Sequence, residues 1–403
     1  MIRPVLSMIL SLLLFSSCRH EKKTDLITID ILEGLKTEKE FRLSEIVDDV
    51  EYVKLETTPE CLLSEASYMI VKNYILVTQD SPKQIYLFTR SGKYLRKIGR
   101  TGKGPDEYIR IDPAIMDPEE NYILAKDYGQ DQIIKFNLDG RVTARFKAKD
   151  LLQAGVACFL IKKPDEVWVS LDFPLIGKKN FPLLRKLDGN LNQMDSLFPV
   201  NTGVTPDIGR TWGSGELYLN DDLVQYRPYS HDTLYSEIRG KLVPRIFFPV
   251  WKDHLPGPYV IYGIHKSSGY SEISCIKEFH GFLIFYASVA PDRGGYMVYS
   301  KTGNDLFLLK KYTIARNNKT FQREQVLNDI DGMINPGNPA FWPENQEFLI
   351  QSHEVIDMKD YLENGSVEPS AIKFPDRRKQ FIDLIKSSKV DDNPILQIFH
   401  LKS

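Results

Sequence analysis

The chain has 403 residues, of which 52 are basic and 54 acidic, for a formal net charge of −2 at pH 7. Length alone would permit two or three domains. A nearly neutral chain lacks the excess of positive charge that is typical of a nucleic-acid-binding protein. Four cysteines are too few for a disulfide framework, so the hydrophobic core must stabilise the fold.

The chain begins like a secretory signal. Arg3 precedes a short, mostly apolar stretch at 5–15, and small residues follow it. A stretch of about eleven residues is too short to span a bilayer. No later segment approaches eighteen apolar residues. We expect residues 1–17 to be a signal peptide.

The end of this segment, Phe15-Ser16-Ser17-Cys18, resembles a bacterial lipobox, although Phe15 stands where leucine is usual. In lipoproteins of that kind the cysteine is acylated and becomes the first mature residue. The resemblance implies lipid attachment at Cys18, a tether or spacer over residues 18–40, and a location in the cell envelope, at the outer membrane or its periplasmic face. An ordinary signal peptide with an incidental cysteine is the alternative.

Five segments along the middle of the chain have the composition of β-hairpins, with apolar residues flanking a turn glycine that can take positive φ. They lie at 85–98, 133–146, 183–191, 234–243 and 296–307, and their turn glycines are Gly92, Gly140, Gly189, Gly240 and Gly303. The intervals between the glycines are 48, 49, 51 and 63 residues. A period near fifty predicts one four-stranded propeller blade per repeat. The longest interval predicts an insertion, around residues 251–269.

Aspartate residues at the ends of apolar segments recur with nearly the same period. Apolar strands ending in aspartate precede most of the hairpins, at Asp80, Asp127, Asp172 and Asp221. Aspartate at a strand end commonly accepts hydrogen bonds from backbone N–H groups of the following turn. We interpret these residues as turn determinants, and a ring of ligand-binding carboxylates is the alternative.

The two ends of the chain can complete the ring. The segment 41–55 contains a strand candidate at 50–55, and the apolar run 394–401 follows the last hairpin. Their pairing as a sixth blade would hide the edges of an open array. The run 377–386 predicts a short amphipathic helix. The sequence therefore predicts an all-β, six-bladed β-propeller over residues 41–403 with a short C-terminal helical segment, with five or seven blades as alternatives.

Several weak motifs occur in an order that is specific as a set. They are Val50-Glu-Tyr-Val-Lys-Leu-Glu-Thr57, Ile98-Gly-Arg-Thr-Gly-Lys-Gly-Pro-Asp-Glu-Tyr108, His231-Asp-Thr-Leu-Tyr235, Asn328-Asp-Ile-Asp-Gly332 and Asp392-Asn-Pro-Ile-Leu396. With them the chain resembles the six-bladed β-propeller lipoproteins of Bacteroides and relatives, a family largely described as domains of unknown function. The glycine-rich motif is also similar to the interblade loop of NHL-repeat propellers. The resemblance implies a fold but no activity, because propellers host many unrelated functions.

Positive charge gathers around the glycine-rich motif, at Arg100, Lys103 and Arg110. The motif is not a phosphate-binding P-loop, because Lys103 is followed by Gly-Pro and not by Ser or Thr at the start of a helix. We interpret it as a crossover between blades. The three basic residues remain candidates for contact with an anionic ligand.

Aromatic residues in expected loops are further candidates, because aromatic platforms suit sugar rings and peptides. They are Tyr108, Tyr128, Trp212, Tyr229 and Trp342. Packing between blades is the favoured interpretation of any one of them, since aromatic residues favour β-sheets.

The sequence shows no catalytic or metal-binding constellation. Its histidines do not recur at equivalent positions in the repeat, and there is no Gly-x-Ser-x-Gly motif. We therefore predict a non-enzymatic binding or scaffold protein for a glycan, a peptide or a partner protein, with no cofactor, no metal ion and no nucleic-acid partner. The alternatives are a propeller hydrolase or lyase with a metal ion in the central channel, and a signalling or assembly component of an envelope complex.

Overall fold

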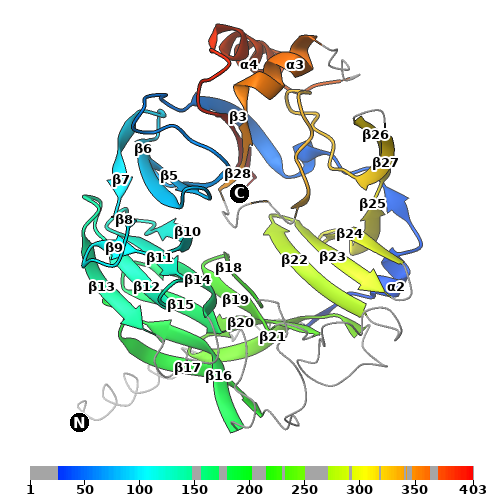
Figure 1. Cartoon of the computed structure of the whole chain (residues 1–403). Coiled ribbons are helices and arrows are strands. Elements are labelled where there is room, and N and C mark those ends of the chain that lie inside the picture. Colours follow the sequence, from blue (N-terminus) through cyan, green and yellow to red (C-terminus); the bar gives the residue numbers. More distant parts are fainter. Residues whose placement is uncertain are drawn as a thin grey trace, which may run out of the picture.

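The strands form sheets arranged as blades around a central axis (Figure 1). The structure is a computed structural model and describes residues 26–147, 156–171, 179–201, 215–228, 232–249, 271–289, 293–316, 319–339, 342, 347–363 and 371–402. Within these ranges no helix is long and apolar enough to cross a bilayer. The expected signal peptide and Cys18 lie outside the described residues, as do Asp172 and the expected insertion at 251–269.

Each of the first five blades consists of four consecutive strands that pair antiparallel in chain order. Blade 1 is β4 (Ala66–Ile70), β5 (Tyr74–Gln79), β6 (Gln84–Thr89) and β7 (Tyr94–Ile98). Blade 2 is β10 (Ile111–Met116), β11 (Ile123–Asp127), β12 (Gln132–Phe136) and β13 (Val142–Lys147). Blade 3 is β14 (Val156–Lys163), β15 (Glu166–Leu171), β16 (Lys179–Leu187) and β17 (Gln193–Asn201). Blade 4 is β18 (Glu216–Asn220), β19 (Leu223–Arg227), β20 (Thr233–Ile238) and β21 (Lys241–Phe247). Blade 5 is β22 (Ser271–Phe279), β23 (Phe282–Val289), β24 (Arg293–Ser300) and β25 (Asp305–Leu309).

The five predicted hairpins are the third and fourth strands of these blades, which confirms the repeat. Positive φ occurs at Gly92, Gly140 and Gly240, as expected. In the other two turns the expectation is wrong, because Leu191 and Asn304 take the positive φ in place of the glycines.

Gly92 should tolerate a side chain worse than Gly240, although both turn glycines have φ near +80°. A Cβ on Gly92 would lie 2.3 Å from the backbone oxygen of Lys54 in the neighbouring blade, whereas a Cβ on Gly240 would meet nothing within 4 Å. The left-handed conformation costs about 1–2 kcal/mol in either variant. We expect Gly92→Ala to lower the free energy of unfolding by at least about 1 kcal/mol more than Gly240→Ala, because overpacking adds to the strain. Equal urea midpoints for the two variants would contradict this contact.

Both chain ends build the sixth blade, which confirms the predicted closure. Its sheet has the order β28 (Phe348–His353), β29 (Ile395–Leu401), β3 (Val47–Lys54), and both pairings are antiparallel. The C-terminal strand β29 therefore lies between an N-terminal strand and β28. The ring has six blades in total.

The N-terminal part of the described chain is folded against the outside of the ring. Strand β1 (Ile27–Thr28) pairs parallel with β21, and β2 (Glu38–Lys39) pairs parallel with β25. Between them lies the short helix α2 (Ile31–Gly34), whose Ile31 is buried. We call residues 27–39 the clasp. The expectation that residues 18–40 form only a spacer is wrong for this part, because its apolar residues pack on blades 4 and 5.

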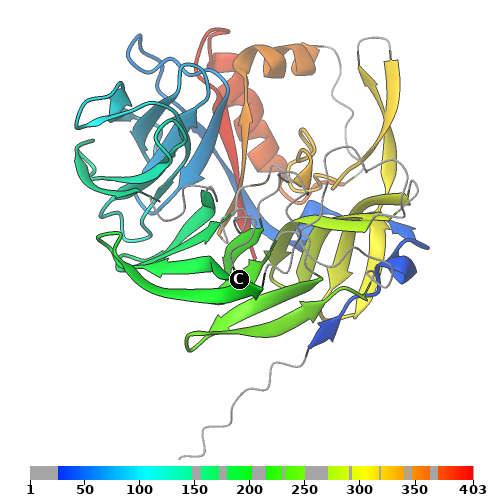
Figure 2. The same cartoon turned by 60° about the horizontal axis from the view of Figure 1, so that its bottom comes forward.

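Two helices lie together beside blade 6 (Figures 1 and 2). Helix α4 (Pro375–Ser387) confirms the predicted amphipathic helix, whereas α3 (Val355–Glu363) was not predicted. The Phe381 ring of α4 stacks on Tyr52 of β3 with the ring centroids 4.4 Å apart. The smaller elements are η1 (Leu43–Glu45), β8 (Arg100–Thr101), β9 (Glu107–Tyr108), β26 (Lys311–Arg316) and β27 (Lys319–Glu324).

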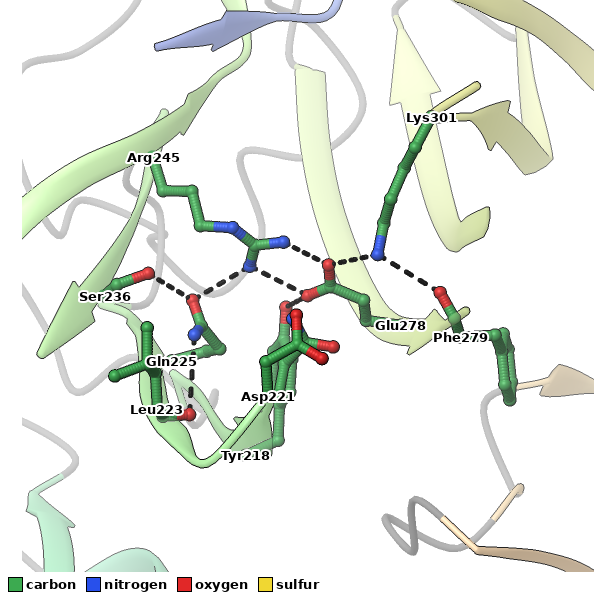
Figure 3. A network of polar contacts seen from close by, with 10 residues as sticks. Tyr218, Asp221, Leu223, Gln225, Ser236, Arg245, Glu278, Phe279 and Lys301 are labelled. Carbon is green, nitrogen blue, oxygen red and sulfur yellow. Dashed lines mark hydrogen bonds and ion pairs between the residues drawn. The ribbon is translucent and has the colours of Figure 1, made fainter. Parts of the chain in front are cut away.

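A buried ionic network joins blades 4 and 5 (Figure 3). The Glu278 carboxylate accepts hydrogen bonds from both terminal nitrogens of Arg245, from Lys301 Nζ at 2.6 Å and from Tyr218 Oη at 3.0 Å. Burial alone would raise the pKa of Glu278, but hydrogen bonds and charge from Arg245, followed by those from Lys301, outweigh it and lower the pKa. The carboxylate is therefore ionised near neutral pH and balances two cations at the interface between these blades.

Candidate functional site

A pocket lies where blade 6 meets blade 1, beneath the start of α3. Its cavity has a volume of about 470 Å³. It is lined by Ser64, Glu65, Ala66, Tyr68, Ile334, Ser352, His353, Glu354, Asp357 and Met358. These residues come from β4 and the loop before it, from the end of β28, from α3 and from the loop around residue 334. The lining contains three carboxylic acids and no lysine or arginine.

The turn from β28 into α3 places the polar side of the pocket. Strand β28 ends at His353 and α3 begins at Val355, so the exposed Ser352 and Glu354 lie on either side of a buried histidine. Helix α3 is held in place by Val355 and Met358, which are buried in a cluster with Phe381, Ile385, Met333 and Ile395. That apolar contact turns Asp357 toward the cavity.

His353 is held by a chain of buried hydrogen bonds. Gln397 Nε2 donates to Asp331 Oδ2 at 2.6 Å, which leaves Gln397 Oε1 to accept from His353 Nε2 at 2.8 Å. Burial lowers the pKa of His353, so the ring is neutral at pH 7. Because Nε2 carries the proton in this arrangement, Nδ1 is a hydrogen-bond acceptor.

Asp331 is the centre of the same network. Besides Gln397, it accepts hydrogen bonds from Tyr52 Oη, from Asn328 Nδ2 at 2.7 Å and from Met333 N at 3.1 Å. Tyr52 lies on β3 and Gln397 on β29, so this single carboxylate joins the strands that come from the two ends of the chain. It also belongs to the motif Asn328-Asp-Ile-Asp-Gly332, whose structural role sequence reasoning missed.

The acidic side of the pocket has a perturbed carboxyl group. Partial desolvation by the surrounding residues, followed by repulsion from Asp357, raises the pKa of Glu354, although the residue is exposed overall. Burial, followed by the charge of Glu354, also raises the pKa of Tyr68, so its side chain is a neutral phenol at pH 7, although its hydrogen bond with Ser352 acts in the opposite direction. Together with Glu65, these groups offer hydrogen-bond acceptors and negative charge, an arrangement suited to a ligand with N–H donors and positive charge.

The predicted basic candidates do not line this pocket. Arg100 forms an ion pair of 2.7 Å with Glu107, which also accepts a hydrogen bond of 2.6 Å from Gly104 N. Hydrogen bonds from that N–H, followed by the charge of Arg100, lower the pKa of Glu107 despite its desolvation. Part of the positive charge expected at this loop is thus neutralised within it, and Lys103 lies exposed nearby.

The structure brings two other candidates, Arg110 and Tyr128, together on blade 2. The guanidinium of Arg110 lies 6.0 Å from the centroid of the half-exposed Tyr128 ring. Asp127 orders both loops, because its carboxylate accepts hydrogen bonds of 3.0 Å from Arg110 N and from Gly129 N. This confirms the prediction that Asp127 is a turn determinant. The pair forms a fixed surface feature that is separate from the pocket lining.

Two aromatic candidates, Tyr108 and Trp342, are buried, which agrees with the interpretation that they serve packing. Tyr108 is packed edge-on against Phe136 with ring centroids 6.3 Å apart. Trp342 lies against Phe279 and donates from Nε1 to the backbone oxygen of Gly337 at 3.0 Å. Trp212 and Tyr229 lie outside the described residues. In the part of the chain that the structure describes, no three His, Cys, Asp or Glu residues are grouped to hold a metal ion.

Comparison with known proteins identifies a family and a fold. A family profile described as "Domain of unknown function (DUF4934)" matches residues 26–400. No curated protein matches the chain. A crystal structure of a Bacteroides fragilis protein considered to be exported is 17% identical, with a TM-score of 0.59 over 94% of this chain and 100% of that one. A Bacteroides vulgatus member of the DUF4221 family is 10% identical, with a TM-score of 0.45 over 88% of this chain and 97% of that one. The first of these structures has the same fold.

Proposed function

The chain belongs to the DUF4934 family of unknown function, and we propose that it is a lipid-anchored envelope protein. We further propose that its propeller binds a partner and does not catalyse a reaction. The lipobox-like Phe15-Ser16-Ser17-Cys18 supports the anchor. Export is further supported by the shared fold of the Bacteroides fragilis protein considered to be exported. Acylation of Cys18 and location in the envelope are parts of this proposal.

The observation that carries the binding role is the pocket between blades 6 and 1. Its lining combines Glu65, Glu354 and Asp357 with the neutral His353, and it includes no lysine or arginine. A protonated amine or a guanidinium group presents the matching donors and charge. We propose that the pocket receives a lysine or arginine side chain of a peptide segment in a partner protein.

Binding suits this site better than catalysis because the polar groups have other hydrogen-bond partners. His353 Nε2 donates to Gln397, and the two serines bond elsewhere, since Ser64 Oγ donates to the backbone oxygen of Ser81 at 2.7 Å and Ser352 bonds to Tyr68. A serine nucleophile would need to lie within hydrogen-bond reach of its base. Neither serine bonds to His353 in the described part of the chain.

Short peptides would test the ligand class. We expect the full chain in detergent to bind acetyl-Gly-Lys-Gly-amide or its arginine analogue, but not the norleucine analogue, in isothermal titration calorimetry. The double variant Glu354→Gln/Asp357→Asn should weaken binding about 10- to 100-fold, because charge-assisted hydrogen bonds contribute roughly 1.5–3 kcal/mol. Affinity should fall as the pH drops through the raised pKa of Glu354, because the protonated acid no longer attracts a cation.

The matched control is Glu363→Gln, which removes one negative charge from the exposed end of the same helix outside the pocket lining. It should leave the affinity unchanged. Equal binding of the lysine and norleucine peptides, or equal affinity of the double variant and the wild type, would contradict the cation site. Binding of neutral oligosaccharides in their place would favour a glycan ligand.

A further inference from the structure

We propose that the ring stands on its edge at the membrane, with the clasp and the outer edges of blades 4 and 5 against the lipid surface. This inference rests on the lipid anchor at Cys18 in the proposed function. It adds a membrane-contacting surface and an orientation, which follow from where the folded chain begins, how that segment is attached and what it exposes.

The clasp is firmly attached to the ring. Strand β1 adds to the outermost strand of blade 4, and Ile29 N donates to the backbone oxygen of Phe247 at 2.9 Å. Ile29 and Ile31 are buried. At the other end, a Cβ on Gly34 would lie 2.3 Å from the Met297 side chain of blade 5, so helix α2 sits directly on that blade. A pull on the N-terminus therefore acts on the outer edge of blades 4 and 5.

The connection from the anchor to the clasp is short. Seven residues lie between Cys18 and Leu26, and the eight steps from one Cα to the next reach at most about 26–29 Å when fully extended. A compact chain of this size is roughly 50 Å across. The anchored edge must therefore stay near the bilayer, and the ring can either stand on that edge or lie flat on one face.

Exposed leucines on the clasp and directly before it favour contact through the edge. Leu26 is 51% exposed and Leu32 is 47% exposed, and both lie within fourteen residues of Cys18. Asp30 and Glu33 lie beside them, and the exposed Lys36 is paired with Glu33. The clasp itself thus offers apolar contact with acidic residues beside it, whereas the basic residues Arg19, Lys22 and Lys23 lie between the anchor and the clasp. The surface that the clasp fits is a zwitterionic lipid surface.

This orientation holds the pocket away from the membrane. Blade 4 lies opposite blade 1 in the six-bladed ring (Figure 1). The residues that line the pocket come from blades 6 and 1 and from the elements beside them. Helices α3 and α4 are in the same half of the ring as the pocket. A partner could approach that half without meeting the lipid surface.

Fluorescence quenching would test the orientation. The acylated full chain is placed in vesicles of phosphatidylethanolamine and phosphatidylcholine that contain nitroxide-labelled lipid. A fluorophore is attached through an azide-bearing amino acid at position 32 or, on the far side, at position 390, where Val390 is 53% exposed. We expect quenching at least threefold stronger at position 32. Equal quenching, as for a ring lying flat, or stronger quenching at position 390 would overturn the inference.

Two further measurements separate the contribution of the leucines from that of the lipid anchor. With the fluorophore at exposed Lys36, the double variant Leu26→Ser/Leu32→Ser should show weaker quenching, and unchanged quenching would overturn the leucine contact. Mass spectrometry of the N-terminal peptide shows whether Cys18 is acylated. Absent acylation overturns both the anchor and the orientation, whereas acylation with equal quenching overturns the orientation alone.

Discussion

Glu278→Ala should lower the free energy of unfolding by about 3–5 kcal/mol, as expected when one partner of a buried ion pair is removed. The Glu278 side chain is 0% exposed and balances the charges of Arg245 and Lys301. Without it, Arg245 and Lys301 remain at the interface of blades 4 and 5 without the carboxylate that they share. Urea unfolding followed by circular dichroism measures the loss.

The matched comparison is Glu33→Ala, which removes a carboxylate from an exposed ion pair with Lys36 and should leave the urea midpoint unchanged. The free energy of unfolding of Glu278→Gln should lie between those of Glu278→Ala and the wild type, because glutamine keeps the shape of the side chain and one acceptor but loses the charge. The pKa of Glu278 is lowered in the folded chain, so its contribution is present above the ordinary glutamate pKa and is lost as the pH falls through the folded value. A wild-type midpoint for Glu278→Ala would contradict this account of the interface.

Asp331→Ala should destabilise the protein by about 4 kcal/mol and loosen both chain ends together. The variant leaves Tyr52 Oη and Gln397 Nε2 without this acceptor, and Asn328 Nδ2 keeps only its hydrogen bond to the backbone oxygen of Ile334. Each buried donor left unpaired costs about 1–3 kcal/mol. Because Tyr52 and Gln397 belong to β3 and β29, hydrogen exchange should become faster in those two strands.

Blade 2 and an exposed variant provide the controls for that experiment. The rate of hydrogen exchange should change less in β10 to β13 than in β3 and β29, because the strands of blade 2 are consecutive in the chain and pair among themselves. Asp139→Ala removes an exposed carboxylate that pairs with Arg96, and it should leave both the stability and the exchange unchanged. Uniform acceleration over all blades would show that Asp331 does not act on the closure in particular.

Local signals in the sequence were enough to predict the blades. Each hairpin joins neighbouring segments through a turn. The alternation of apolar and polar residues and the turn residues therefore predict each hairpin from a stretch of about fifteen residues. The closing blade was predictable because an apolar strand candidate lay at each end of the chain. The pairing of β29 with β3 bears this out.

The clasp and the pocket depend on contacts that no local pattern reports. Strands β1 and β2 have two residues each, and they pair with segments more than 200 residues away. The pocket similarly brings Tyr68 beside Ser352, nearly 300 residues later. Packing was the favoured interpretation of Tyr108 and Trp342, and both are buried. No local pattern singled them out, because an aromatic residue in a loop is buried or exposed according to what packs over it.

Asp221 shows how a local signal can mislead. It follows an apolar strand, like Asp80 and Asp127, but that strand is the first of its blade and not the second. Asp221 and Asp222 form the turn between β18 and β19 with φ of 49° and 59°. Aspartate is common both at strand ends and in tight turns with positive φ, so spacing alone placed this residue one strand too late.

Photo-cross-linking in the native cell tests most directly whether the pocket binds a partner. Benzoylphenylalanine would replace Ser352 in the pocket or, as the control, the exposed Met194 of blade 3. We predict an adduct from position 352 that maps to a lysine- or arginine-containing segment, is lost in the Glu354→Gln/Asp357→Asn background and is absent from position 194. The same adduct from both positions, or an adduct that persists in the double variant, would contradict a binding role for this pocket.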